Sequence, residues 1–150
     1  MTITKEEVAE AVRVWAHAWH TRDMQTIMAM EAQAVGFGFR PCAWRNHPGN
    51  TYPEGRDRSL EQFFGQKVSY SVALQELQTA VEGDVGLAWG VFLEQWQDKG
   101  QPPEQARVRF SKVLTRGSQG WQVVLYHRDI QPFAANGRYS KALTIVSPAS

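Results

Sequence analysis

Gly120-Trp121-Gln122-Val123-Val124-Leu125-Tyr126-His127-Arg128-Asp129 is the stretch that decides the fold of this chain. An aromatic and β-branched run that follows a glycine turn is typical of a β-strand. The run ends in an ionisable triplet, so this strand also carries candidate chemistry. We therefore take it as the closing strand of a sheet and work outward from it.

Five further segments have the composition of strands, separated by Gly, Asp and Pro. Glu82-Gly83-Asp84 and Gly117-Ser118-Gln119-Gly120 are typical of hairpin turns, and a longer loop is expected over residues 98–103. We predict strands over residues 33–40, 50–54, 68–81, 85–97, 105–116 and 121–130.

Three helices are predicted before the long strands. Thr4 and Glu7 have the spacing of a capping box, and the apolar residues that follow recur at helical spacing on one stripe. Asp23 is expected to cap a second helix ending at Met30, and Asp57 to cap a third. The stripe of the first helix consists of Val8, Ala11, Val12, Trp15, Ala18 and Trp19, with His17 on the opposite side, and that of the third of Leu60, Phe63 and Phe64. Helices first and antiparallel strands last indicate an α+β fold, with the helices on one face of a curved sheet.

Composition excludes several classes of function. The chain has 150 residues, a net charge of +1 and 21% charged residues, which suits one domain and gives no broad basic face for nucleic acid. No apolar run approaches the roughly 20 residues of a membrane span. The N-terminus lacks the features of a secretory signal, and Cys42 alone cannot form an internal disulfide. We expect a cytoplasmic protein that binds a small molecule.

Residues 5–133 resemble the nuclear transport factor 2-like superfamily, especially its SnoaL-like and kinase-association branches. The matching features, in order, are Thr21-Arg22-Asp23 after the first helix, Phe39-Arg40-Pro41, Tyr52-Pro53-Glu54-Gly55-Arg56-Asp57 leading to Phe63-Phe64, and the closing strand. The resemblance implies one SnoaL-like domain over residues 1–133. The tail, residues 134–150, would then lie at a dimer interface or add an edge strand.

The fold that the resemblance implies is a cystatin-like α+β barrel, a cone of curved antiparallel sheet wrapped by three N-terminal helices. It encloses an apolar pocket and usually forms a homodimer whose sheets face each other. Members include ketosteroid isomerases, polyketide cyclases, dehydratases, epoxide hydrolases and non-catalytic assembly domains. The function must therefore be argued from the side chains in the pocket.

Two cations are candidates for that pocket. Arg40 takes the place where the isomerases have an acidic base, and Lys112 the place where they have a protonated acid and the kinase assembly domains an arginine. A guanidinium cannot abstract a proton, but it stabilises an enolate or phenolate. The alternatives are that Arg40 pairs with a surface carboxylate such as Glu31 or Glu54, and that Lys112 extends into water.

His127 and Asp129 are the candidates for proton transfer. Strict alternation places both on one strand face with Trp121, Val123 and Leu125, where Asp129 could orient the imidazole. Alternatively, His127 donates to a backbone carbonyl at the pocket rim. Asp23 could also reach the cone, although a helix cap explains it equally.

Aromatic residues provide the candidate ligand contacts, and packing in the core or across a dimer seam would also explain them. Trp15 and Trp19 face inward from the first helix, and the loop over residues 41–52 is rich in aromatic residues, His and Arg. The candidate substrate-binding residues are Trp15, Trp19, Trp44, His47, Tyr52 and Tyr126.

We expect no metal and no cofactor, because the spacing of His, Cys and carboxylate residues fits no metal motif and no glycine-rich phosphate loop occurs. The leading hypothesis is a cofactor-independent lyase, isomerase or cyclase acting on a small aromatic or polycyclic substrate. Arg40 and Lys112 would stabilise negative charge and His127 would move a proton. The alternatives are a non-catalytic ligand-binding or assembly domain, and a hydrolase in which Glu76 or Glu94 activates water. A titratable base that points inward beside the cations would favour the enzyme.

Overall fold

Three helices and four long strands make up the part of the chain that the computed structural model describes, residues 2–31 and 56–133. Along the chain these elements are α1 Lys5–His20, α2 Met24–Glu31, α3 Arg56–Gly65, β1 Lys67–Glu82, β2 Val85–Asp98, β3 Glu104–Gly117 and β4 Gly120–Phe133. The strands predicted at 33–40 and 50–54 and the tail 134–150 lie outside the described residues. The other four strands are confirmed, each slightly longer than predicted.

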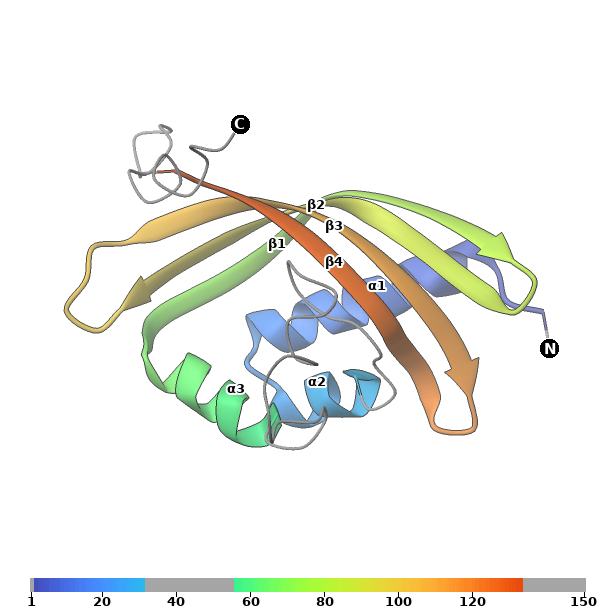
Figure 1. Ribbon diagram of the computed structural model, residues 1–150, viewed down its shortest axis with the longest axis horizontal. Helices are drawn as coiled ribbons and strands as arrows, with labels where there is room; N and C mark the ends of the chain where they lie inside the picture. The colour runs from blue at the N-terminus through green and yellow to red at the C-terminus, as the bar shows by residue number, and fades with distance from the viewer. Residues whose placement is uncertain (1, 32–55, 134–150) are drawn as a thin grey trace, which may run out of the picture.

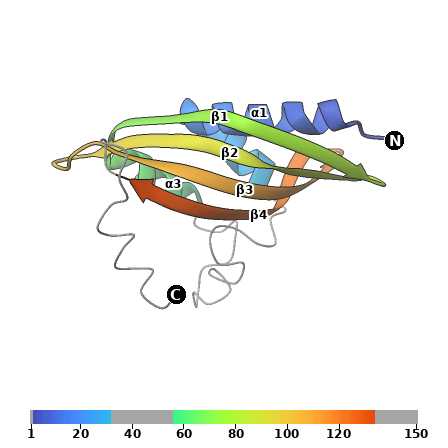
Figure 2. The same cartoon turned by 90° about the horizontal axis from the view of Figure 1, so that it is seen from above.

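The strands form one antiparallel sheet in the order β1-β2-β3-β4. The sheet is bent into an arc, and Figure 1 shows the three helices inside this arc. Viewed from above in Figure 2, α1 runs alongside β1 and β2. The α+β prediction, with helices packed on one face of a curved sheet, is confirmed.

Helix α1 begins with the predicted capping box. The Thr4 hydroxyl accepts from the Glu7 N–H at 3.1 Å, and the Glu7 carboxylate accepts from the Thr4 N–H at 2.8 Å. The apolar stripe faces the sheet, with Val8 and Val12 fully buried and His17 exposed, as predicted. The local sequence therefore sets both the start of the helix and its rotation about its axis.

The turn between α1 and α2 joins three elements. Arg22 has a left-handed backbone, with φ of 59°, and its guanidinium donates to the carbonyls of Phe64 at 3.4 Å and Lys67 at 3.5 Å. Asp23 then caps α2, because its carboxylate accepts from the Thr26 N–H at 3.1 Å. Of the two alternatives for Asp23, the helix cap is therefore the one observed. Helix α3 begins at Arg56, so Asp57 lies in its first turn and not before it.

The sheet has three register shifts, one between Lys67 and Ser69 at the start of β1 and two bulges within the strands. One lies between Leu74 and Glu76 in β1, and the other between Val123 and Leu125 in β4. Bulges bend a strand and increase its twist, which is how a sheet curves around helices. Next to the bulge in β1, Gly90 pairs with Leu77, and a Cβ atom at Gly90 would lie 1.9 Å from the Glu76 carbonyl oxygen. The close approach of the two strands therefore requires glycine.

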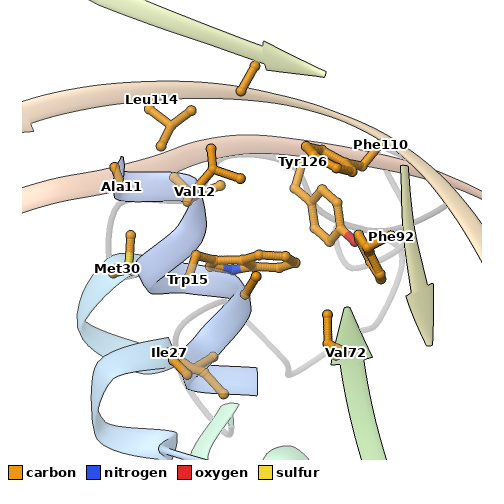
Figure 3. Close-up of a cluster of buried hydrophobic side chains, with 14 of the residues drawn as sticks. Ala11, Val12, Trp15, Ile27, Met30, Val72, Phe92, Phe110, Leu114 and Tyr126 are labelled. Carbon is orange, nitrogen blue, oxygen red and sulfur yellow. The ribbon is translucent and has the colours of Figure 1, made fainter. Parts of the chain in front are cut away.

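The core fills the space between the helices and the concave face of the sheet. Figure 3 shows Trp15 of α1 near its centre, with Tyr126, Phe92 and Phe110 of the sheet on one side and Ile27 and Met30 of α2 on the other. Four polar or charged side chains are buried in the same region: Glu31, Glu94, Lys112 and Gln122. Buried charges are rare in domains of this size, so these residues define the region where a site should be sought.

Candidate functional site

The concave face of the sheet carries the ionisable groups of the interior. Lys112 pairs across the strands with Ala88 of β2 and Tyr126 of β4, and all three are buried. Glu94 lies on the same face further along β2. Side chains of opposite charge are therefore held on one inner surface beneath α1.

The bulge in β4 corrects the predicted position of His127 and Asp129. Val113 pairs with Leu125 but Leu114 pairs with Val123, so Val124 is an extra residue and the alternation shifts there. After the bulge Tyr126 and Arg128 lie inward, whereas His127 and Asp129 are exposed. The prediction that these two residues share a strand face with Val123 is wrong, because strict alternation does not hold across a bulge.

On the outer face, Asp129 forms an ion pair with Arg109, the residue directly opposite on β3. The two side chains are 59% and 66% exposed. Asp129 therefore pairs with the neighbouring strand in solvent instead of orienting the His127 imidazole.

Lys112 is the most unusual residue of the interior. It is 2% exposed, and its Nζ lies 3.2 Å from the centroid of the Trp15 ring and 3.3 Å from that of Tyr126. Within the described segments Nζ has no hydrogen-bond partner. Burial holds the pKa of the Lys112 amine well below its usual range, opposed by the Glu31 carboxylate and reinforced by the Arg128 guanidinium. The alternative in which Lys112 extends into water does not occur.

Aromatic rings surround this amine. The Trp15 and Tyr126 rings meet edge to face with centroids 5.2 Å apart, and Phe92 meets Trp15 in the same way at 6.0 Å (Figure 3). Phe110, 5.5 Å from Nζ, lies next to Lys112 on the inner face. The surroundings are therefore largely apolar, which strengthens any electrostatic interaction made there.

A second buried group links three strands. Glu94 is 7% exposed, and its carboxylate accepts from the Tyr70 hydroxyl at 2.6 Å and from the Arg128 guanidinium at 3.3 Å. Burial, followed by the Glu94 charge, raises the pKa of Tyr70. The hydrolase alternative named Glu94 as a mid-strand carboxylate, and the structure places it inside. Glu76, the other residue of that alternative, is exposed.

Glu31 is the interior residue that sequence reasoning missed. It was treated as a surface carboxylate, but it is fully buried at the end of α2. Ile27, Met30 and Glu31 are the buried residues of this helix, at relative positions i, i+3 and i+4. Helical spacing would therefore have placed Glu31 on the inner face, had its charge not suggested solvent.

The remaining predicted site residues divide into two groups. Trp19 is partly buried and packs edge to face on Phe63 at 5.9 Å, so both tryptophans of α1 face inward as predicted. Arg40, Trp44, His47 and Tyr52 lie outside the described residues. The structure thus brings Trp15, Trp19, Lys112 and Tyr126 into one aromatic interior.

No group of three or more His, Cys, Asp or Glu side chains that could hold a metal ion occurs in residues 2–31 and 56–133. Over the same residues, none of the helices has the length and apolar character needed to cross a membrane.

Comparison with known proteins places the fold. No protein-family model matches the chain, and the search of curated proteins finds no match. Among solved structures, a proposed aromatic ring hydroxylase from Novosphingobium aromaticivorans is similar with a TM-score of 0.68 and 15% identity, covering 84% of this chain and 90% of that one. A nuclear transport factor 2-like superfamily protein from Salmonella enterica gives 0.66 and 14%, covering 83% and 88%.

A third similar structure is the CaMKII hub of S. rosetta, with a TM-score of 0.59 and 18% identity over 87% of this chain and 98% of that one. Identities this low show the fold and leave activity open. The arrangement of helices, curved sheet and inward-facing aromatic residues identifies this chain as having the nuclear transport factor 2-like fold.

Proposed function

We propose that this protein is a cofactor-independent lyase, isomerase or cyclase that acts by acid–base chemistry on a small aromatic or polycyclic substrate. The observation that carries the proposal is the Lys112 amine, buried between the Trp15 and Tyr126 rings. Glu31 and Glu94 are buried in the same interior, so titratable carboxylates lie inward beside the cations. Buried ionisable groups gathered in one interior are typical of functional sites, which supports the proposal.

Lys112 is the proposed proton acceptor, in place of the exposed His127. Burial favours the neutral amine, and a neutral amine in an apolar site can abstract a proton from carbon. The earlier hypothesis gave Lys112 the role of a fixed cation, which requires the protonated form that burial disfavours.

Tyr126 is the proposed donor to the oxygen on which negative charge develops. Burial raises the pKa of its hydroxyl, with the Arg128 guanidinium opposing, so the hydroxyl stays protonated near neutral pH. A base and a donor that contact each other in a dry site are the two groups that enolisation of a ketone needs. Arg40 remains a predicted second group for the developing anion.

Proton abstraction next to a carbonyl is measurable without knowing the natural substrate. We expect the protein to accelerate exchange of the α-protons of β-tetralone in deuterium oxide, followed by proton NMR. Lys112→Met and Tyr126→Phe should lose most of the acceleration. Lys99→Met, which removes an exposed lysine of the β2–β3 loop, is the matched control and should retain it.

Exchange at the buffer rate for a panel of aromatic ketones would contradict the proposal, as would equal exchange in the wild type and Lys112→Met. Circular dichroism of each variant establishes that the fold is retained.

Assembly is a second function, favoured by a different observation. Trp89 on the outer face of β2 is 42% exposed, and Leu87, Val91 and Leu93 alternate with inward residues along the same strand. A row of apolar residues that are exposed or only partly buried suits contact with a second copy of the chain. The similarity to a CaMKII hub supports assembly. The assembly that we propose is a homodimer formed through this face.

Sedimentation of Trp89→Glu tests the assembly. We expect wild-type protein to sediment as a dimer and the variant as a monomer. Val14→Glu, which changes an exposed apolar residue of α1, should remain dimeric. A wild-type monomer would contradict this second function and leave the acid–base proposal untouched.

A further inference from the structure

We infer that Lys112 acts as a nucleophile that forms an imine with an aldehyde or ketone held in the aromatic interior. The inference rests on the proposed function and deepens it, because it names a carbonyl compound as the ligand and a covalent bond as the means of activating it. Three features of the surroundings of Nζ support it.

The first feature is the number of groups that can receive its N–H bonds. A neutral amine has two N–H bonds and one lone pair, whereas an ammonium has three N–H bonds and no lone pair. Nζ lies over two ring faces, those of Trp15 at 3.2 Å and Tyr126 at 3.3 Å, and finds no conventional acceptor among the described residues. Ring faces accept weak hydrogen bonds from N–H groups. Two N–H bonds are thus accommodated, and the lone pair remains available for a carbonyl carbon.

The second feature is the set of charges that faces the amine. Glu31 of α2 acts on it with negative charge, Arg128 of β4 with positive charge, and Trp15 and Tyr126 contribute only neutral groups. The effects of these two opposite charges on the pKa of Lys112 oppose each other, so desolvation has the largest effect on it. Desolvation favours the neutral amine. A lysine desolvated in an apolar site is the usual form of an imine-forming nucleophile.

The third feature is the donor beside the amine. The Tyr126 side chain that packs against Nζ carries a hydroxyl that stays protonated because burial raises its pKa. Addition to a carbonyl turns its oxygen into an alkoxide, which must receive a proton. The nucleophile and the proton donor are therefore supplied by cross-strand partners on β3 and β4.

The reaction balances without any co-reactant. The Nζ lone pair forms a C–N bond while the C=O π bond breaks, and Tyr126 protonates the resulting alkoxide and recovers a proton from nitrogen. The carbinolamine then loses its hydroxyl, with the second nitrogen proton, as one water molecule, leaving the C=N bond. An imine makes the neighbouring C–H bonds more acidic once it is protonated, so Lys112 would activate the carbonyl compound through a covalent bond in place of abstracting the proton itself. The aromatic surroundings favour an aryl aldehyde or aryl ketone.

Reductive trapping tests the inference on the whole chain. Protein is incubated with benzaldehyde and sodium cyanoborohydride at about pH 6.5, and labelled lysines are identified by peptide mass spectrometry. The exposed Lys5 and Lys99 are internal references. We expect Lys112 to be labelled at least about tenfold faster than either reference, because exposed lysines are almost wholly protonated at this pH.

Two comparisons make the result decisive. Lys112→Met should lose the fast label, and Tyr126→Phe should slow it. Labelling of Lys112 no faster than of Lys5 and Lys99 in the folded wild-type protein would overturn the inference, and that measurement requires no variant.

The outcome separates this inference from the proposed function. Exchange of β-tetralone protons without trapping at Lys112 would overturn the imine and leave acid–base catalysis standing. Trapping without exchange would support the imine and contradict the enolisation proposal.

Discussion

The two faces of the sheet hold their charged residues in different environments. On the inner face, Arg128 and Glu94 form an ion pair with side chains only 19% and 9% exposed. The Tyr70 hydroxyl also donates to the Glu94 carboxylate. On the outer face, Arg109 and Asp129 form a pair that is mostly in solvent. Each pair includes one residue of β4. In the inner pair it is Arg128, two positions from Tyr126, and in the outer pair it is Asp129, three positions from Tyr126. The same strand therefore provides a buried polar network and a solvated one, and only the buried one can influence chemistry strongly.

The largest expected effect is the loss of one partner of the inner pair. Arg128→Met leaves the buried Glu94 carboxylate with the Tyr70 hydroxyl as its one hydrogen-bond partner among residues 2–31 and 56–133, which should cost about 3–5 kcal/mol of unfolding free energy. Arg109→Met removes the exposed counterpart and should cost less than about 1 kcal/mol. Urea denaturation of both variants gives the comparison directly. Equal losses would mean that the inner face is as well solvated as the outer one.

Lys112→Met should raise the free energy of unfolding instead of lowering it. The substitution keeps an unbranched side chain, one heavy atom shorter, and removes an amine that finds no conventional acceptor within the described segments, so we expect a gain of about 1–4 kcal/mol in unfolding free energy. Lys99→Met on the exposed loop should leave the midpoint of urea denaturation unchanged. A stabilised protein without activity would show that the interior retains this amine for chemistry. Destabilisation would instead show that the two ring contacts outweigh the cost of burial.

Glycine at position 90 should also prove necessary. Gly90→Ala places a methyl group against the Glu76 carbonyl at the β1 bulge, and we expect a loss of about 1–3 kcal/mol. Gly65→Ala is the matched control, because the added methyl group there meets no described residue within 4 Å apart from its chain neighbours and its own helix backbone. Thermal unfolding of the two variants measures the difference. Similar melting temperatures would show that the bulge can move without cost.

The smallest effect is the pH dependence of stability. Because the folded-state pKa of Lys112 is depressed, the unfolded chain binds more protons between that pKa and the unfolded value of about 10.4, so stability rises with pH in this window. Between about pH 8 and 9 the wild type should therefore gain up to about 1.4 kcal/mol relative to Lys112→Met. Urea denaturation of both proteins at the two pH values measures this. A constant difference between them would mean that Lys112 stays protonated in the folded state.

Much of the fold could be predicted because local signals and global packing agree. Thr4 and Glu7 determined the start of α1, the Val8 and Trp15 stripe determined its buried face, and glycine turns separated the four long strands. These features depend on near neighbours in the sequence, so they can be read without the structure.

The interior face of β4 could not be predicted, because it does not depend on near neighbours in the sequence. Nothing in Val123-Val124-Leu125 marks the middle residue as the extra one, because the bulge is set by pairing with β3 and by the curvature of the sheet. Glu31 was missed because burial of a carboxylate depends on groups from other elements. The chemistry of the site thus rests on contacts between distant segments.

The bulge at Val124 makes this strand tolerant of a change in chain length. Val113 pairs with Leu125 and Leu114 with Val123, so a β4 without Val124 would form a regular ladder in the same register. Tyr126 and Arg128 would still face inward, and His127 and Asp129 outward. A lineage with this fold could therefore lose one codon here without exchanging the residues that face its interior.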